Sequence, residues 1–166
     1  MFEYDLLIIK KMIAEAKQRG EAISSLPLVI YARKSTKDVT NVSLKTQVDV
    51  CQRALLGCKE VKTIQIYQED SKSGYFIDGR NDFLEILERV KKGEVKVVMA
   101  YSIDRITRNV ADCEIIDRIF REAGARYFLA TQCFEDTPMH RLVKRELISL
   151  AQFEPEYTSE KACENM

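Results

Sequence analysis

One arginine and one serine follow the first apolar run of this sequence. The run spans residues 28–32, and Arg33 and Ser35 come directly after it. Residues two apart on an extended backbone point to the same side, so the guanidinium and hydroxyl groups are expected to lie together. A plainer interpretation stays open, in which Ser35 caps a turn and Arg33 is a solvated charge.

Further arginines stand at similar places along the chain. Arg105 and Arg108 follow another apolar run and are three apart, so a helical turn puts them on one face, with Asp104 beside them. The polar residues 70–74 follow a third run and precede Arg80. Four arginines around one serine suit a phosphate group, because planar guanidinium groups match its oxygens and stabilise the charge that it gains in a transition state.

The apolar pattern predicts the elements that position these residues. Helices are expected over residues 4–19, 43–56, 81–92 and 109–123 and from Pro138 onward, and strands over residues 28–32, 62–67, 95–100 and 126–131. Alternating strands and helices predict an α/β fold of three layers, with a mainly parallel sheet and helices on both faces. The carboxyl ends of such strands are where ligands bind, and the arginines lie there.

Composition excludes several classes of protein. The 166 residues are 46% apolar and 31% charged, which is typical of a globular domain, and no apolar run approaches the ~20 residues that cross a bilayer. Five scattered cysteines without a CxxC pair predict free thiols, and with a single histidine they make a zinc site improbable. Lys and Arg number 26 against 26 Asp and Glu, so composition alone gives no support for nucleic-acid binding.

Six short motifs together resemble one family. The chain is similar to the catalytic domain of serine site-specific recombinases, the resolvase and invertase group, and most of all to the N-terminal domain of large serine recombinases and integrases. The likeness runs from about residue 28 to residue 160. The matching segments are YARKST at 31–36, SLKTQ at 43–47, DSKSG at 70–74 followed by Arg80, DRITR at 104–108, EDT at 135–137 and AQFE at 151–154.

The resemblance implies a resolvase-like sheet of four to five strands and assigns roles to residues. Ser35 would attack a DNA phosphodiester and form a phosphoserine bond, and Asp104 would orient an arginine or take part in proton transfer. The arginines that would stabilise the phosphate are Arg33, Arg80, Arg105 and Arg108. The supporting shell would comprise Tyr31, Gln47, Asp70, Ser73, Gly74 and Glu154.

The resemblance also implies how such a protein works. Strands would be rejoined without ATP, no cofactor or metal is expected, and the partner would be the DNA backbone, with no small-molecule substrate and no membrane. Homodimers would pair into a tetramer in the synaptic complex. A cytoplasmic location is expected, associated with the nucleoid when on DNA, because the N-terminus lacks the bases of a secretory signal.

Some residues keep a plainer alternative. Asp104 is open to a purely structural role as an ion-pair partner, and Gln47 to simple solvation on its helix. His140, the lone histidine, is expected on the surface of the last helix's first turn rather than as a catalytic base.

Pro155 departs from the family pattern. It stands where the family carries an arginine of the active site, and proline in a helix interior removes a donor and costs about 3 kcal/mol. The long C-terminal helix is therefore expected to be interrupted near Pro155. The departure also keeps an alternative function open, a catalytically impaired assembly or DNA-accessory module. An unrelated nucleotide-binding domain is disfavoured, because no GxGxxG or P-loop follows the first strand.

Three regions are predicted along the chain. Residues 1–25 form an N-terminal helical extension that either covers the sheet edge or mediates self-association. Residues 26–136 form the resolvase-like catalytic domain. Residues 137–166 form a dimerisation helix and acidic tail, with no DNA-binding domain after it. The apolar stripe of the last helix is longer than one sheet face requires, so part of it is expected to pack on a second subunit or to stand exposed.

Overall fold

Four parallel strands form one sheet in the computed structural model, which describes residues 1–35, 42–71 and 79–164. The strands are β1 (Leu26–Ser35), β2 (Val61–Ser71), β3 (Val97–Ala100) and β4 (Arg126–Leu129). Their order across the sheet is β2-β1-β3-β4, and every neighbouring pair runs parallel. The predicted α/β class and parallel sheet are confirmed.

Strand β1 sits inside the sheet and sends side chains into both layers. Leu28 and Ile30 enter the apolar cluster on one face, and Val29 and Tyr31 enter the cluster on the other. This alternation explains why the first strand reads as an unbroken apolar run, as buried parallel strands do.

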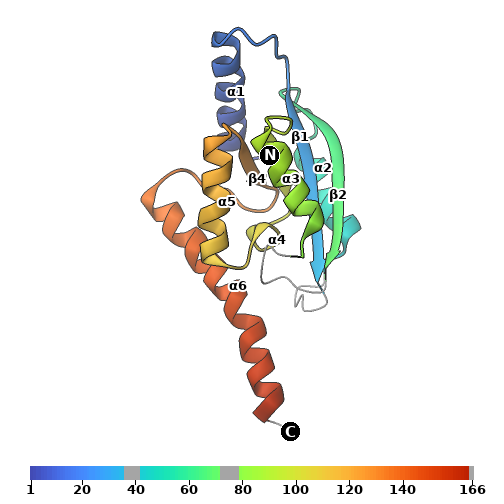
Figure 1. Cartoon of the computed structure of the whole chain (residues 1–166), viewed down its shortest axis with the longest axis vertical. Coiled ribbons are helices and arrows are strands. Elements are labelled where there is room, and N and C mark those ends of the chain that lie inside the picture. Colours follow the sequence, from blue (N-terminus) through green and yellow to red (C-terminus); the bar gives the residue numbers. More distant parts are fainter. Residues whose placement is uncertain (36–41, 72–78, 165–166) are drawn as a thin grey trace.

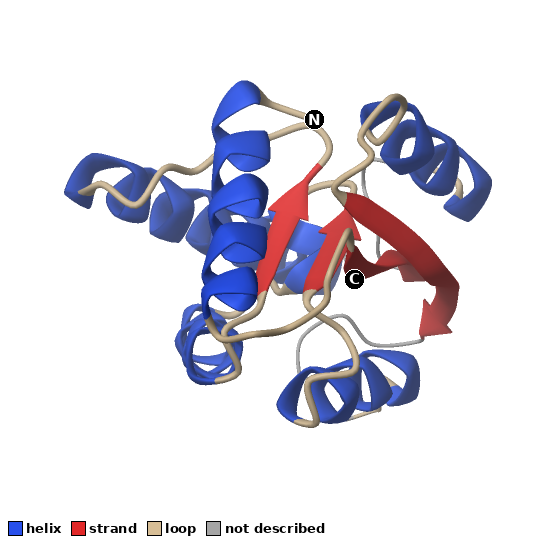
Figure 2. Cartoon of the chain, turned by 90° about the horizontal axis from the view of Figure 1, so that it is seen from above, coloured by secondary structure: helices blue, strands red, loops and turns tan. Residues whose placement is uncertain are grey.

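Helices cover both faces of the sheet (Figure 2). On one face pack α3 (Asn81–Lys91), α5 (Val110–Glu122), the one-turn helix α4 (Ile103–Ile106) and the long α6 (Pro138–Glu164). On the other face pack α1 (Glu3–Gln18) and α2 (Leu44–Ala54). The turn α4 lies inside a segment that the sequence pattern predicted only as a connection between β3 and α5.

The N-terminal helix α1 lies against the sheet. Ile9 is fully buried and Ile13 is 8% exposed, and both belong to the apolar cluster that contains Met99 of β3 and Phe128 of β4. The Met1 amino group donates a hydrogen bond to the carbonyl of Ala54 at 2.6 Å, which ties α1 to the end of α2. The extension therefore packs over β3 and β4 on one face of the sheet.

Helix α6 corrects one prediction. Its helical backbone continues from Pro138 through Pro155 to Glu164, so the helix is not interrupted near Pro155. The φ that the proline ring fixes is close to the helical value, so the helix continues past Pro155 although it loses one main-chain hydrogen bond and must accommodate the ring next to a carbonyl of the preceding turn. The second half of α6 extends away from the sheet (Figure 1). No helix in the described residues is long and apolar enough to span a membrane.

Asp5 provides a test of how α1 is docked. Asp5 is only 4% exposed, its Oδ1 accepts from the Cys133 thiol at 3.7 Å, and its Oδ2 finds no hydrogen-bond partner among the described residues. Burial raises the pKa of Asp5 above its ordinary value of 3.8. A raised carboxyl pKa means that the folded state favours the protonated form, so its contribution to stability is present below pH 3.8 and is lost as the pH rises through the raised value.

We expect Asp5→Asn to increase the free energy of unfolding at pH 7 and to change it less at about pH 3.5, where the unfolded chain also protonates this carboxyl group. Urea unfolding at both pH values measures this, with Glu15→Gln, an exposed acid of the same helix, as the control. An Asp5→Asn variant that is destabilised equally at both pH values would contradict the assignment.

Candidate active site at the strand ends

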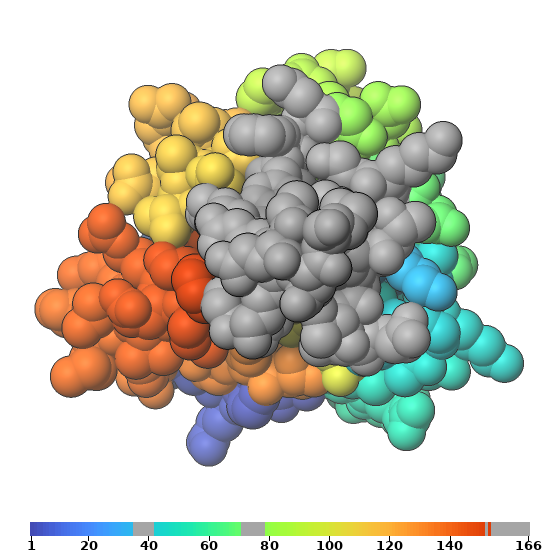
Figure 3. All heavy atoms as spheres, turned by 90° about the horizontal axis from the view of Figure 1, so that it is seen from below, coloured from blue at the N-terminus to red at the C-terminus, as the bar shows by residue number. Residues whose placement is uncertain are grey.

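The arginines singled out by the sequence come from separate segments of the chain. Arg33 lies near the end of β1, Arg80 directly precedes α3, Arg105 lies in α4, and Arg108 lies in the connection from α4 to α5. Figure 3 looks onto this carboxyl edge of the sheet from below, with α2 on the right, α3 at the top and α6 on the left. Parallel strands bring these segments to one edge because they all end on the same side.

Arg33 is held by its main chain as well as by its side chain. The fully buried Gln47 of α2 accepts from the Arg33 N–H at 3.2 Å and donates to the Arg33 carbonyl at 2.9 Å. Gln47 also donates to the Val42 carbonyl at 3.0 Å. The alternative of a solvated Gln47 is therefore wrong: the side chain fixes the backbone just before Ser35.

The turn α4 supplies carbonyl groups that orient two of the guanidinium groups. Arg33 Nη2 donates to the Asp104 carbonyl at 2.8 Å, and Arg33 Nε donates to the Arg105 carbonyl at 3.4 Å. Arg80 Nη2 donates to the same Arg105 carbonyl at 3.0 Å, and Nη1 to the Ile106 carbonyl at 2.6 Å. Three consecutive carbonyls of one turn thus set the direction of both side chains.

A tyrosine and a carboxylate complete the surroundings of Arg80. Arg80 Nη2 donates to the hydroxyl of the buried Tyr31 at 2.8 Å, and that hydroxyl donates a short hydrogen bond to Glu69. Glu69 lies 3.7 Å from Arg80 Nε and accepts from the backbone N–H of Asp82 at 3.2 Å. The Arg80 guanidinium also stacks 4.2 Å from the Phe83 ring centre. Burial raises the pKa of Tyr31, so its phenol stays protonated and can donate to Glu69.

Asp104 stands between two arginines. Its Oδ2 is 3.1 Å from Arg105 Nη2 and 3.6 Å from Arg108 Nη2, and its Oδ1 accepts a short hydrogen bond from Ser102. Arg105 Nη1 reaches back to the Arg33 carbonyl at 3.1 Å, so the α4 turn and the end of β1 hold each other. Asp104 is thus the ion-pair partner of both Arg105 and Arg108.

Four arginine side chains are buried together at this edge of the sheet. Arg33, Arg80 and Arg105 are at most 1% exposed and Arg108 is 7% exposed. Glu69 pairs with Arg80, and Asp104 pairs with Arg105 and Arg108. A guanidinium stays protonated when buried, so its charge must be met by oriented dipoles and anions. Such a cluster is suited to stabilise an added phosphate that carries further negative charge.

Asp70 is not brought into this cluster, and four other predicted residues lie wholly or in part outside what the structure describes. Asp70 is exposed on β2, opposite Lys34 in the strand register. Ser73 and Gly74 lie outside the described residues, and for Ser35 and Glu154 the structure describes the backbone only. The backbone of Ser35 pairs with Ser71 at the end of β1, two residues beyond Arg33.

Glu69 is the residue that sequence analysis missed. The polar residues from Gln68 onward predicted a loop, whereas β2 continues to Ser71 and pairs residue by residue with β1. In a strand that extends to Ser71, Glu69 lies on the same face as Tyr67 and beside Tyr31. The alternation of side chains along a strand could therefore have identified it.

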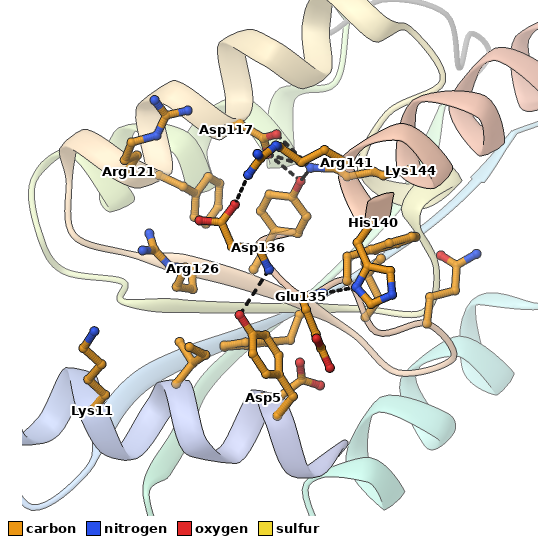
Figure 4. A pocket seen from close by; sticks show the side chains of 18 residues that line it. Asp5, Lys11, Asp117, Arg121, Arg126, Glu135, Asp136, His140, Arg141 and Lys144 are labelled. Carbon is orange, nitrogen blue, oxygen red and sulfur yellow. Dashed lines mark hydrogen bonds and ion pairs between the residues drawn. The ribbon is translucent and has the colours of Figure 1, made fainter. Parts of the chain in front are cut away.

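A separate cavity of about 500 Å³ lies between α1, α5, α6 and β4 (Figure 4). None of the four clustered arginines lines it. His140 does line it, and its Nδ1 accepts from the backbone N–H of Glu135 at 2.9 Å. The histidine is therefore outside the arginine cluster. The described residues contain no group of three or more His, Cys, Asp or Glu side chains that is arranged to hold a metal.

Comparison with known proteins points to one family. The family model of the resolvase N-terminal domain matches residues 28–166. The integrase-like protein y4lS of Sinorhizobium fredii (strain NBRC 101917 / NGR234) is 31% identical over 107 residues, which are 64% of this chain and 51% of that protein. The chain thus spans about half the length of the curated relative that it matches.

Solved structures share the fold at low sequence identity. The N-terminal catalytic domain of TP901-1 integrase has a TM-score of 0.58 at 19% identity, over 80% of this chain and 98% of that one. A resolvase family site-specific recombinase from Streptococcus pneumoniae also reaches 0.58, at 20% identity, over 85% and 97%. The C-terminal catalytic domain of ISC1926 TnpA, an IS607-like serine recombinase, reaches 0.54 at 24% identity, over 75% and 80%.

The Glu69–Arg80 pair gives a stability test of the cluster. We expect Glu69→Leu to lower the free energy of unfolding by about 3–5 kcal/mol, because removing one partner leaves a buried charge unmatched. The matched control is Glu94→Leu, whose carboxylate pairs with Arg89 at 3.3 Å but is 51% exposed. Its loss is expected to cost at most about 1 kcal/mol. Equal effects of the two substitutions in urea unfolding would show that burial of the Arg80 pair is unimportant.

Proposed function

The chain belongs to the resolvase family, whose N-terminal domain model it matches over residues 28–166, and from this premise we propose that it transfers DNA strands as a serine recombinase. The observation that carries the proposal is the buried cluster of Arg33, Arg80, Arg105 and Arg108 beside the end of β1, where Ser35 stands. Site-specific recombination, of the integrase or resolvase type, is the activity that we assign to it.

The proposed reaction replaces one phosphodiester bond by another. The Ser35 hydroxyl oxygen attacks a DNA phosphorus and loses its proton, while the bond from phosphorus to the 3′ oxygen breaks and that oxygen leaves as a 3′ hydroxyl. The products are a phosphoserine linkage and a free DNA end. Because the new bond conserves the energy of the old one, a 3′ hydroxyl rejoins the strands by the reverse attack without ATP.

The arginines are proposed to stabilise the phosphate as its charge grows. Their preset directions matter because oriented donors need no reorganisation during the reaction. Asp104 holds Arg105 and Arg108, Gln47 holds the backbone of Arg33, and Glu69 with Tyr31 holds Arg80. These four are positioning residues in the proposal, and Ser73, Gly74 and Glu154 stay proposed members of the surrounding shell.

Pro155 supports a second candidate function. It occupies the position of a family arginine, so a chain that keeps the fold but has lost a transition-state donor would serve as an assembly or DNA-accessory module. Helix α6 continues past Pro155. Compared with an arginine at this position, the chain therefore lacks one positive charge and one backbone N–H, but it does not lack the helix.

We expect Ser35→Ala to abolish a covalent protein–DNA adduct and Pro155→Arg to increase it by about tenfold or more, since one transition-state donor is worth about 10²–10³-fold. The chain is fused to a DNA-binding domain of known site, mixed with nicked DNA that carries the site, and resolved on a denaturing gel.

Pro155→Ala distinguishes the effect of the missing charge from that of the missing helical hydrogen bond, because alanine restores the N–H without adding a guanidinium group. A gain with arginine but not alanine supports the missing donor, and equal yields in all three backgrounds contradict it. Absence of an adduct in every background favours the accessory module.

Helix α6 is the proposed dimerisation surface. Along one side it exposes Met139, Leu142, Val143, Leu150 and Phe153, each at least 40% accessible, while Ile148 on the opposite side is buried in the core. Exposed apolar stripes of this kind mark association surfaces. We propose a homodimer through α6, which pairs into a tetramer on DNA, with residues 26–136 as the catalytic part.

We expect Leu150→Asp to weaken self-association at least about tenfold, because burial of one leucine is worth about 1.5–3 kcal/mol. Light scattering over a concentration series measures the change. Ser149→Asp, at the adjacent exposed position, is the matched control and should leave the association constant nearly unchanged. A strictly monomeric wild-type chain would reject this surface.

A further inference from the structure

We infer that Gln132 is a positioning residue for the arginine cluster. Its side chain holds the start of α4, and α4 carries the main-chain carbonyls to which Arg33 and Arg80 donate. The catalytic meaning of this contact rests on the proposed function, whereas the contact itself does not.

The contact solves a local problem at the start of α4. Ile103 is the first residue of this turn and is 2% exposed, and the first N–H groups of a helix have no partner within it. Ser102, at the capping position, does not accept from them and instead donates to the Asp104 carboxylate. Gln132 Oε1 accepts from the Ile103 N–H at 2.8 Å, from 29 residues further along the chain.

The segment that carries Gln132 is fixed to the same connection. After β4, the Ala130 N–H donates to the Ala100 carbonyl at 2.8 Å, and the Thr131 N–H donates to the Tyr101 carbonyl at 3.1 Å. The Thr131 hydroxyl donates to that carbonyl as well, at 2.7 Å. Residues 130–132 therefore run alongside residues 100–103 as an extension of the sheet, which gives the Gln132 amide a rigid base.

The other end of α4 is where the arginines are held. The carbonyls of Asp104, Arg105 and Ile106 accept from Arg33 and Arg80, and these residues lie within one turn of Ile103. One turn of helix rises only about 5.4 Å, so a shift of its first N–H moves all three carbonyls. Gln132 thus sets the directions of the Arg33 and Arg80 guanidinium groups indirectly, through the position of α4.

The first test measures the effect of the Gln132–Ile103 hydrogen bond without DNA. In the full chain, NMR hydrogen exchange is measured for the Ile103 amide and for the Nε–H groups of Arg33 and Arg80. Gln132→Leu, which removes the acceptor, is expected to speed all three by at least about tenfold, the worth of one such hydrogen bond. Gln132→Glu keeps an acceptor oxygen and should retain slow exchange. Gln52→Leu, at an exposed position of α2, is the matched control.

The second test measures the rate of the proposed reaction. The rate of adduct formation at saturating DNA should fall about tenfold or more in Gln132→Leu and recover in Gln132→Glu, since small misplacements of catalytic groups cost up to about 100-fold. A purely structural role would lower stability without this selective rescue.

Different results overturn different claims. Unchanged exchange of the Arg33 and Arg80 Nε–H groups in Gln132→Leu, or equal acceleration of amides throughout β1, overturns the positioning role. Slow exchange that depends on Gln132, together with no adduct in the wild-type chain fused to a DNA-binding domain, supports the positioning role and rejects the proposed function instead.

Discussion

Buried positive charge is the constraint on which the rest of the site depends. Arg33, Arg80 and Arg105 are almost fully enclosed, and guanidinium groups do not give up their proton when they are buried. Among the described residues, this charge is met by main-chain carbonyls of a single turn, by the Tyr31 hydroxyl and by the carboxylates of Glu69 and Asp104. Carbonyl dipoles orient a cation without cancelling its charge, which is what the proposed stabilisation of a phosphate requires.

This constraint explains why irregular structure lies at the centre of a regular fold. The carbonyls of a strand pair with neighbouring strands and those of a long helix pair with its own N–H groups. Helix α4 is a single turn, so its last carbonyls are available to other groups. The sheet brings β1 and β3 side by side, and their ends place Arg33 against that turn. The long α6 contributes Ile148 to the same layer and leaves its other side for further contacts.

Sequence analysis predicted the elements whose buried residues follow a regular apolar pattern. It failed where main-chain hydrogen bonds determine the structure without such a pattern. The apolar runs of β1 and β3 and the stripes of α2, α3 and α5 predicted these elements to within a few residues. The end of β2 is polar, yet its ladder with β1 continues because strand pairing needs main-chain groups rather than apolar side chains. Glu69 was hidden by that extension, and Asp70, one residue on, points to the other face. Pro155 misled for a related reason, since helix continuity depends on its neighbours as well as on its own missing N–H.

Helix α1 lies outside the residues that match the family, yet its Ile9 and Ile13 share a core with Val97, Met99 and Phe128. The region that matches the family is therefore smaller than the region that shares this core. A chain trimmed to the family boundary at residue 28 would uncover the apolar face of β3 and β4 and lose the Met1–Ala54 hydrogen bond. Insolubility of such a fragment would report the loss of this cover rather than any weakness of the sheet itself.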